Sequence, residues 1–108
     1  MKIYISGKIT GLQKRDYRGK FKAAANRLRM QGYEVVDSSR MDVYDLTYAQ
    51  YMAIDTTLLS FCDAIYMLDN WWNSNGARLE KEYAESLGLV IMYEEEDGYA
   101  KEEKENPA

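Results

Sequence analysis

The chain has 108 residues, 46% of them hydrophobic, and a net charge of −4 at pH 7, so it is long enough to bury one core as a single domain. It contains no histidine, which excludes histidine-based catalytic triads, histidine-ligated metals and a histidine acid or base. The single cysteine, Cys62, excludes an internal disulfide, and no apolar run approaches the roughly 20 residues that span a bilayer. We therefore expect a cytoplasmic protein without a signal peptide or membrane contact.

The first half of the chain has the pattern strand, helix, strand. Residues 2–6 alternate and contain β-branched side chains, which predicts a strand, and the two glycines of residues 6–11 permit a tight loop after it. Apolar residues recur at helical spacing over about residues 15–31, and Gly32 is well placed just beyond the end of this helix. Residues 33–36 predict a second strand.

The second half repeats the alternation. Thr47 and Gln50 form a capping-box pattern that predicts the start of a second helix. Two continuous apolar runs, residues 64–68 and 89–93, have the length and composition of strands that are covered on both faces. A third predicted helix, starting near Asn75, lies between these two runs.

This order of elements predicts the α/β class. We expect a single-domain three-layer sandwich of βαβαβαβ topology, flavodoxin-like or Rossmann-like, with a four-stranded parallel sheet in the order 2-1-3-4. The domain covers residues 1–93. Residues 94–108 carry seven acidic and two basic side chains and almost no large apolar ones, so we expect an acidic, mobile tail there.

Two carboxylates lie where the helical pattern predicts core residues. Glu80 is at the centre of a small apolar face of its helix, made by Gly76, Ala77, Tyr83, Ala84 and Leu87. Asp55 is at the centre of the apolar stripe of the preceding helix, made by Tyr48, Tyr51, Met52, Leu58, Leu59 and Cys62. Burial raises the pKa of a carboxyl group and suits it to acid, base or nucleophile chemistry, and a structural ion pair or cap is the alternative.

Candidate binding residues follow the predicted strands, because open parallel sheets bind ligands beyond the carboxyl ends of their strands. They are Ser6, Gly7, Lys8, Ile9, Thr10 and Gly11 after the first strand, Asp37 after the second, and Asn70, Trp71, Ser74 and Gly76 after the third. The loop around Lys8 does not match a Walker loop, so an ordinary strand-to-helix turn is the alternative to a phosphate cradle. Trp71 and Trp72 either stack on a base or pack at the loop.

Basic residues crowd between Lys14 and Arg29. A solvated helix face explains this crowding, and an anion-attracting patch is the alternative. Aromatic side chains are sparse in this segment, so we expect no binding of a nucleic-acid polymer.

Four stretches together resemble the nucleoside 2-deoxyribosyltransferase-like superfamily, and within it a short bacterial and phage branch described as a domain of unknown function. They are residues 1–11, 51–55 and 62–68, and Trp71 with residues 74–80. The resemblance implies cleavage of an N-glycosidic bond without a metal or cofactor, with Glu80 attacking the anomeric carbon and Asp55 assisting near the base and sugar. The chain departs from the branch pattern at three positions on the expected pocket rim, namely Lys8, Asp37 and Asn70.

We therefore expect a hydrolase or deoxyribosyltransferase that acts on the N-glycosidic bond of a nucleoside or nucleotide. Two alternatives use a similar pocket: a nucleotide-binding or nucleotide-sequestering protein without turnover, and a glycohydrolase of dinucleotides such as NAD. Aromatic residues expected on the surface near the Asp55 helix, Tyr44, Tyr48 and Tyr51, predict a homodimer or larger homo-oligomer.

Overall fold

The computed structural model describes residues 1–95 and 100–102. In these residues five strands form one sheet in the order β2-β1-β3-β4-β5. In chain order the strands are β1 (Lys2–Ser6), β2 (Glu34–Asp37), β3 (Ala64–Met67), β4 (Val90–Glu94) and β5 (Ala100–Glu102). Strands β1 to β4 pair in parallel, which confirms the predicted four-stranded arrangement and its order 2-1-3-4. β5, which was not predicted, pairs antiparallel with β4 at the edge of the sheet.

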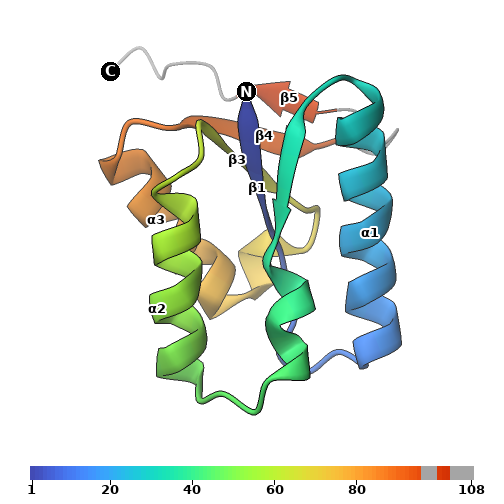
Figure 1. Ribbon diagram of the computed structural model, residues 1–108, viewed down its shortest axis with the longest axis vertical. Helices are drawn as coiled ribbons and strands as arrows, with labels where there is room; N and C mark the ends of the chain where they lie inside the picture. The colour runs from blue at the N-terminus through green and yellow to red at the C-terminus, as the bar shows by residue number, and fades with distance from the viewer. Residues whose placement is uncertain (96–99, 103–108) are drawn as a thin grey trace.

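Three helices cover the two faces of the sheet. They are α1 (Lys14–Met30), α2 (Tyr48–Leu59) and α3 (Asn75–Ser86), and two short 3-10 helices, η1 (Ser38–Val43) and η2 (Trp71–Asn73), lie in the connections. α1 lies on one side of the sheet and α2 and α3 lie on the other (Figure 1), which confirms the three-layer sandwich. Within the described part of the chain, no helix combines the length and apolarity that a membrane span requires.

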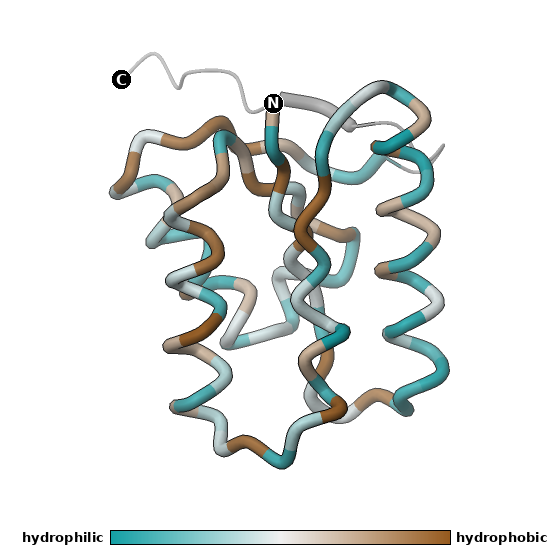
Figure 2. The backbone as a smooth tube through the Cα atoms, in the orientation of Figure 1, coloured by the Kyte–Doolittle hydropathy of each residue, from teal (hydrophilic) through white to brown (hydrophobic). Residues whose placement is uncertain are grey.

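The core consists of two apolar clusters, one on each side of the sheet. Alternation along β1 divides its side chains between them, because successive residues of a strand point to opposite faces. The cluster under α1 contains Ile3, Ile5, Tyr17, Phe21, Ala24, Ala25, Leu28, Ala64, Tyr66, Leu68 and Met92. The cluster under α2 and α3 contains Tyr4, Leu59, Cys62, Ile65, Met67, Ala77, Ala84 and Ile91. Figure 2 shows α1 mainly in hydrophilic colours, as expected for a helix that buries a single stripe.

Side-chain caps fix where α2 and α3 begin. The Thr47 hydroxyl accepts a hydrogen bond from the Gln50 N–H at 3.2 Å and the Gln50 side chain accepts one from the Thr47 N–H at 2.8 Å, which confirms the predicted capping box. Ser74 caps α3 by accepting from the Ala77 N–H at 3.1 Å. Both helix starts border the cavity described below, so the caps also set the position of that cavity's wall.

The sheet extends into the segment that was predicted as the tail. Glu94, predicted as the first residue of the tail, ends β4, and its side chain is 9% exposed and paired with Arg27 at 2.5 Å. A charged residue can occupy this strand position because Arg27 supplies the opposite charge that a buried carboxylate requires. The prediction of a mobile tail over residues 94–108 otherwise falls largely on 96–99 and 103–108, which lie outside the described residues.

Two predicted apolar faces are less buried than their periodicity implies. Leu87 is 43% exposed because α3 ends at Ser86 and Leu87 is only its cap residue. In α2, Leu59 is the buried residue, whereas Tyr48 is 54% exposed. The N-terminal part of α2 therefore borders a cavity instead of the core.

Candidate functional site

Glu80 is held between α3 and the first strand. Its side chain is 5% exposed, and its two oxygens accept hydrogen bonds from different residues of β1. The Ser6 hydroxyl donates to Oε1 at 2.7 Å, and the Tyr4 hydroxyl donates to Oε2. Tyr4 and Ser6 are two residues apart in a strand, so both side chains point to the same face and reach the same carboxylate. This geometry orients the carboxyl group of Glu80 through both of its oxygens.

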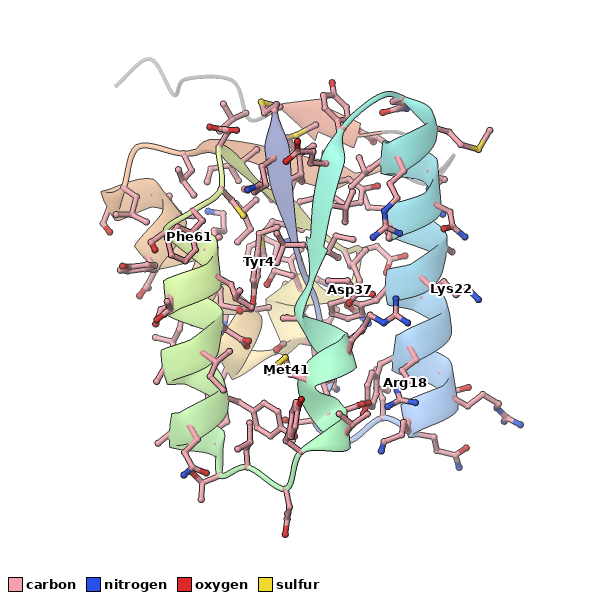
Figure 3. All side chains as sticks on the ribbon, viewed as in Figure 1. Tyr4, Arg18, Lys22, Asp37, Met41 and Phe61 are labelled. Atoms are coloured by element: carbon pink, nitrogen blue, oxygen red, sulfur yellow. The ribbon has the colours of Figure 1, made fainter. Side chains whose placement is uncertain are left out.

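Tyr4 is a proton donor at this site. Its ring is fully buried, and its hydroxyl oxygen is also hydrogen-bonded to Ser38 Oγ at 3.0 Å. Burial, followed by the charge of Glu80, raises the pKa of Tyr4 well above its ordinary value, so the phenol stays protonated. One phenol proton serves the Glu80 bond, and the Ser38 hydroxyl therefore supplies the proton of the second bond. Tyr4 lies in the interior between the sheet and α2 (Figure 3).

Asp55, on α2, is electrostatically coupled to Glu80. Burial, followed by the charge of Asp55, raises the pKa of Glu80, and burial also raises the pKa of Asp55 above that of an ordinary aspartate. Two carboxyl groups that interact in this way titrate as a pair, which favours sharing one proton between them near neutral pH. Asp55 Oδ1 is buried and has no hydrogen-bond partner among the described residues, which is unusual for a buried polar atom.

A cavity of about 640 Å³ lies over the two carboxylates. Its walls come from the loop after β1, from η1, and from the N-terminal parts of α2 and α3, so it lies beyond the carboxyl ends of β1 and β2. The lining consists of Gly7, Lys8, Ile9, Thr10, Tyr17, Ser38, Ser39, Asp42, Tyr48, Tyr51, Met52, Asp55, Asn73, Ser74, Asn75, Gly76, Ala77, Arg78 and Glu80. Its volume is that of a site for a nucleotide-sized molecule.

The structure brings many of the predicted site residues together in this lining. These are Gly7, Lys8, Ile9, Thr10, Asp55, Ser74, Gly76 and Glu80. The cavity wall is tightly built at Gly7, where an added Cβ would lie 2.7 Å from Leu68 Cδ1. Gly7 therefore permits the loop after β1 to approach β3 closely.

Five predicted binding residues lie outside the lining. Ser6 acts beneath it through Glu80, and the Asn70 side chain accepts the Lys8 N–H at 3.0 Å, which holds the loop in place. Gly11 has a φ of +87°, which a glycine adopts readily, and it is not part of the lining. Asp37 accepts the Ser39 N–H at 3.0 Å and thereby caps η1.

The fifth of these residues, Trp71, packs instead of stacking in the cavity. Its ring centroid is 5.8 Å from that of Tyr93, and the Lys81 ammonium lies 5.4 Å from its centroid. Trp72 is 63% exposed and is also absent from the lining. The packing alternative therefore describes Trp71, whereas Trp72 is largely exposed.

Tyr4, which lies beneath the cavity, and Asp42, which lines it, were not among the predicted site residues. A signal for Tyr4 was present, because a buried tyrosine needs a partner for its hydroxyl and Ser6, two positions later, points to the same face. Asp42 lies on a 3-10 helix that has no periodic signal, and it accepts hydrogen bonds from Tyr17 at 2.5 Å and from Arg18 Nε at 2.8 Å. These bonds hold η1 against α1 at the rim of the cavity.

Comparisons with known proteins agree with this fold. The chain is similar to the solved structure of a CMP N-glycosidase of Clostridium botulinum, with a TM-score of 0.62, 16% sequence identity, and coverage of 86% of this chain and 70% of that one. No protein of curated function matches the sequence. Residues 1–93 match the model of a family described as "Domain of unknown function (DUF4406)". The chain therefore belongs to the DUF4406 family, and it has the fold of that N-glycosidase.

Proposed function

We propose that this protein cleaves the N-glycosidic bond of a nucleoside or nucleotide, with Glu80 as nucleophile and Asp55 as acid and orienting group. The observation that carries the proposal is the coupled carboxyl pair in the lining of a nucleotide-sized cavity. Carboxylate pairs of this kind catalyse glycosidic bond cleavage, because one member meets the positive charge at the anomeric carbon while the other protonates the leaving group.

The proposed reaction needs only the two carboxyl groups and an incoming nucleophile such as water. The ionised Glu80 oxygen forms a bond to C1′ as the bond between C1′ and the base nitrogen breaks, and the base leaves with that electron pair. Asp55, carrying the shared proton, donates it to the base. Water or an acceptor nucleobase then attacks C1′ and displaces Glu80, and Asp55 takes the proton of the incoming group. The hydrogen bonds from Tyr4 and Ser6 keep the Glu80 carboxylate in one orientation during both steps.

Two further lines support this reading. The four sequence stretches resemble the nucleoside 2-deoxyribosyltransferase-like superfamily, in which a glutamate matching Glu80 attacks the anomeric carbon. The fold is shared with a protein whose name states that it cleaves the N-glycosidic bond of CMP. We further propose that Lys8, Thr10 and Ser74, which line the cavity, contact ribose hydroxyls or a phosphate.

One observation favours the alternative of a nucleotide-binding protein without turnover. Glu80 already accepts a hydrogen bond on each oxygen, and its raised pKa favours the neutral acid, which is a poor nucleophile. A protonated Glu80 would still bind a ligand through the cavity. Turnover requires the pair to hold its single proton on Asp55 when substrate is bound.

Incubation of the pure protein with pooled nucleosides, nucleotides and NAD, followed by mass spectrometry of the released bases, tests the proposal. Release of base from a nucleoside or nucleotide is the expected result. Tight binding of a nucleotide with no base released over hours would contradict the proposal and support sequestration. The Glu80→Gln variant should release no base in the same assay. Glu82→Gln is its matched control and should keep the activity, because Glu82 is an exposed glutamate of the same helix.

A further inference from the structure

A second, smaller depression lies beside the cavity, between α1 and the junction of β2 with η1. Its volume is about 290 Å³, and we call it the basic groove. Residues of α1 form one side of it, and residues 37–43 form the other (Figure 3). It is lined by Arg18, Lys22, Ala25, Asn26, Arg29, Asp37, Ser39, Arg40 and Val43.

Positive charge dominates the basic groove. Arg18 is neutralised by Asp42, with which it makes two hydrogen bonds. Lys22, Arg29 and Arg40 make no ion pair with any residue in the described ranges 1–95 and 100–102. All three side chains line the groove, so a multiply charged anion bound there would be attracted by several cations that have no competing partner.

The one carboxylate of the groove does not balance these cations. Asp37 is engaged by its own neighbour, because Ser39 donates to it from both the backbone N–H and the hydroxyl, at 3.0 and 2.5 Å. Its charge therefore serves to hold the start of η1. A solvated helix face does not explain this arrangement, since Arg40 faces the basic segment of α1 from a different element.

The basic groove and the cavity are immediate neighbours. Ser39 lines both of them. The Arg18–Asp42 ion pair also joins them, because Arg18 lines the groove and Asp42 lines the cavity. A ligand that has its sugar beside Glu80 can thus extend over this ion pair into the groove.

We propose that the basic groove binds a diphosphate group of the ligand, so that the preferred ligands are nucleotides with two or more phosphates or a dinucleotide joined by a diphosphate. This inference rests on the proposed function for the position of the sugar and base. The groove itself rests only on its charges and its shared wall with the cavity. Diphosphate fits the requirement because it places several negative oxygens within reach of guanidinium groups on both sides, and guanidinium binds such oxygens in a bidentate manner.

Calorimetric titration with inorganic phosphate, inorganic diphosphate, CMP, CDP and NAD tests the proposal. Diphosphate should bind more tightly than phosphate, and CDP roughly tenfold more tightly than CMP, since each charge-assisted hydrogen bond contributes about one factor of ten. Arg40→Gln should remove the advantage of CDP over CMP. The matched control is Arg15→Gln, which removes the same charge from an α1 side chain that is 86% exposed and lies outside the groove.

The possible outcomes distinguish failure of the diphosphate site from failure of the proposed bond cleavage. Equal affinity for CMP and CDP, or equal effects of Arg40→Gln and Arg15→Gln, would overturn the diphosphate site even if CMP is cleaved. Binding of a single-stranded oligonucleotide through Arg40 without binding of diphosphate would also overturn it. Diphosphate binding that depends on Arg40 supports the site even if no base is released, in which case the proposed function alone fails. Tighter binding of NAD than of CDP would support the dinucleotide form of the proposal.

Discussion

Replacing Glu80 with glutamine should make the protein more stable than the parent at alkaline pH. The substitution preserves the volume of the side chain and its ability to accept a hydrogen bond from Tyr4 or Ser6, while it removes the ionisable group. In the parent, burial and the charge of Asp55 raise the pKa of Glu80 from 4.5 to about 8. The folded state therefore holds a proton that the unfolded state releases near pH 4.5.

The sign and size of the effect follow from this difference. Because the pKa is raised in the folded state, the stabilisation by the bound proton is complete below about pH 4.5 and is lost as the pH rises through about 8. Each tenfold difference in proton affinity is worth about 1.4 kcal/mol, so the free energy of unfolding of the parent should fall by on the order of 4 kcal/mol between pH 5 and pH 9. Glutamine cannot ionise, and the Glu80→Gln variant should lack this part of the decrease.

Urea denaturation of the parent and of Glu80→Gln at intervals from pH 5 to pH 9 measures the effect. The two curves of unfolding free energy against pH should diverge as the pH rises, with the variant the more stable at pH 9. Glu82→Gln, on the exposed part of the same helix, should follow the parent. Parallel curves for the parent and Glu80→Gln would show that Glu80 is ionised in the folded state as it is in solution, and would refute the reasoning from its burial.

Three further outcomes are expected. Glu94→Gln should destabilise the fold by about 2 kcal/mol in urea denaturation, because it breaks the partly buried ion pair with Arg27; an unchanged midpoint would mean that this pair contributes nothing. Gly7→Ala should cost about 1–3 kcal/mol and weaken nucleotide binding, because its methyl group would meet Leu68 at 2.7 Å; full stability and affinity would show that the loop moves freely. Light scattering at tens of micromolar should show a dimer or larger assembly that Tyr44→Ser weakens, since Tyr44 is 57% exposed; a monomeric parent would contradict this.

Most of the fold could be predicted because local signals and tertiary demands agree. The continuous apolar runs of β3 and β4 fit strands covered on both faces, and Thr47 with Gln50 gave the start of α2. β5 could not be predicted, because its residues are Ala100, Lys101 and Glu102, which have little strand propensity and no apolar alternation. Its pairing is set by the free edge of β4, which is not visible in the local sequence.

The candidate site could be predicted only in part, and the reason differs from residue to residue. A carboxylate within an apolar helical face is unusual enough to single out Glu80. Tyr4 carries no comparable signal, because a tyrosine in a central strand is an ordinary core residue until its partner is known. The sequence left the role of Trp71 open between ligand stacking and packing, because an aromatic residue after a strand suits either role, and in the structure its ring packs on Tyr93.

The rate of base release by the parent and by Glu80→Gln, measured on the same nucleotide with its affinity determined in parallel, tests the central proposal most directly. Loss of the nucleophile should lower the rate by several orders of magnitude and leave the affinity within a few fold, while the Glu82→Gln control should keep the parent's rate. A Glu80→Gln variant that releases base at nearly the parent's rate, or one that loses affinity in step with activity, would contradict a nucleophilic role for Glu80.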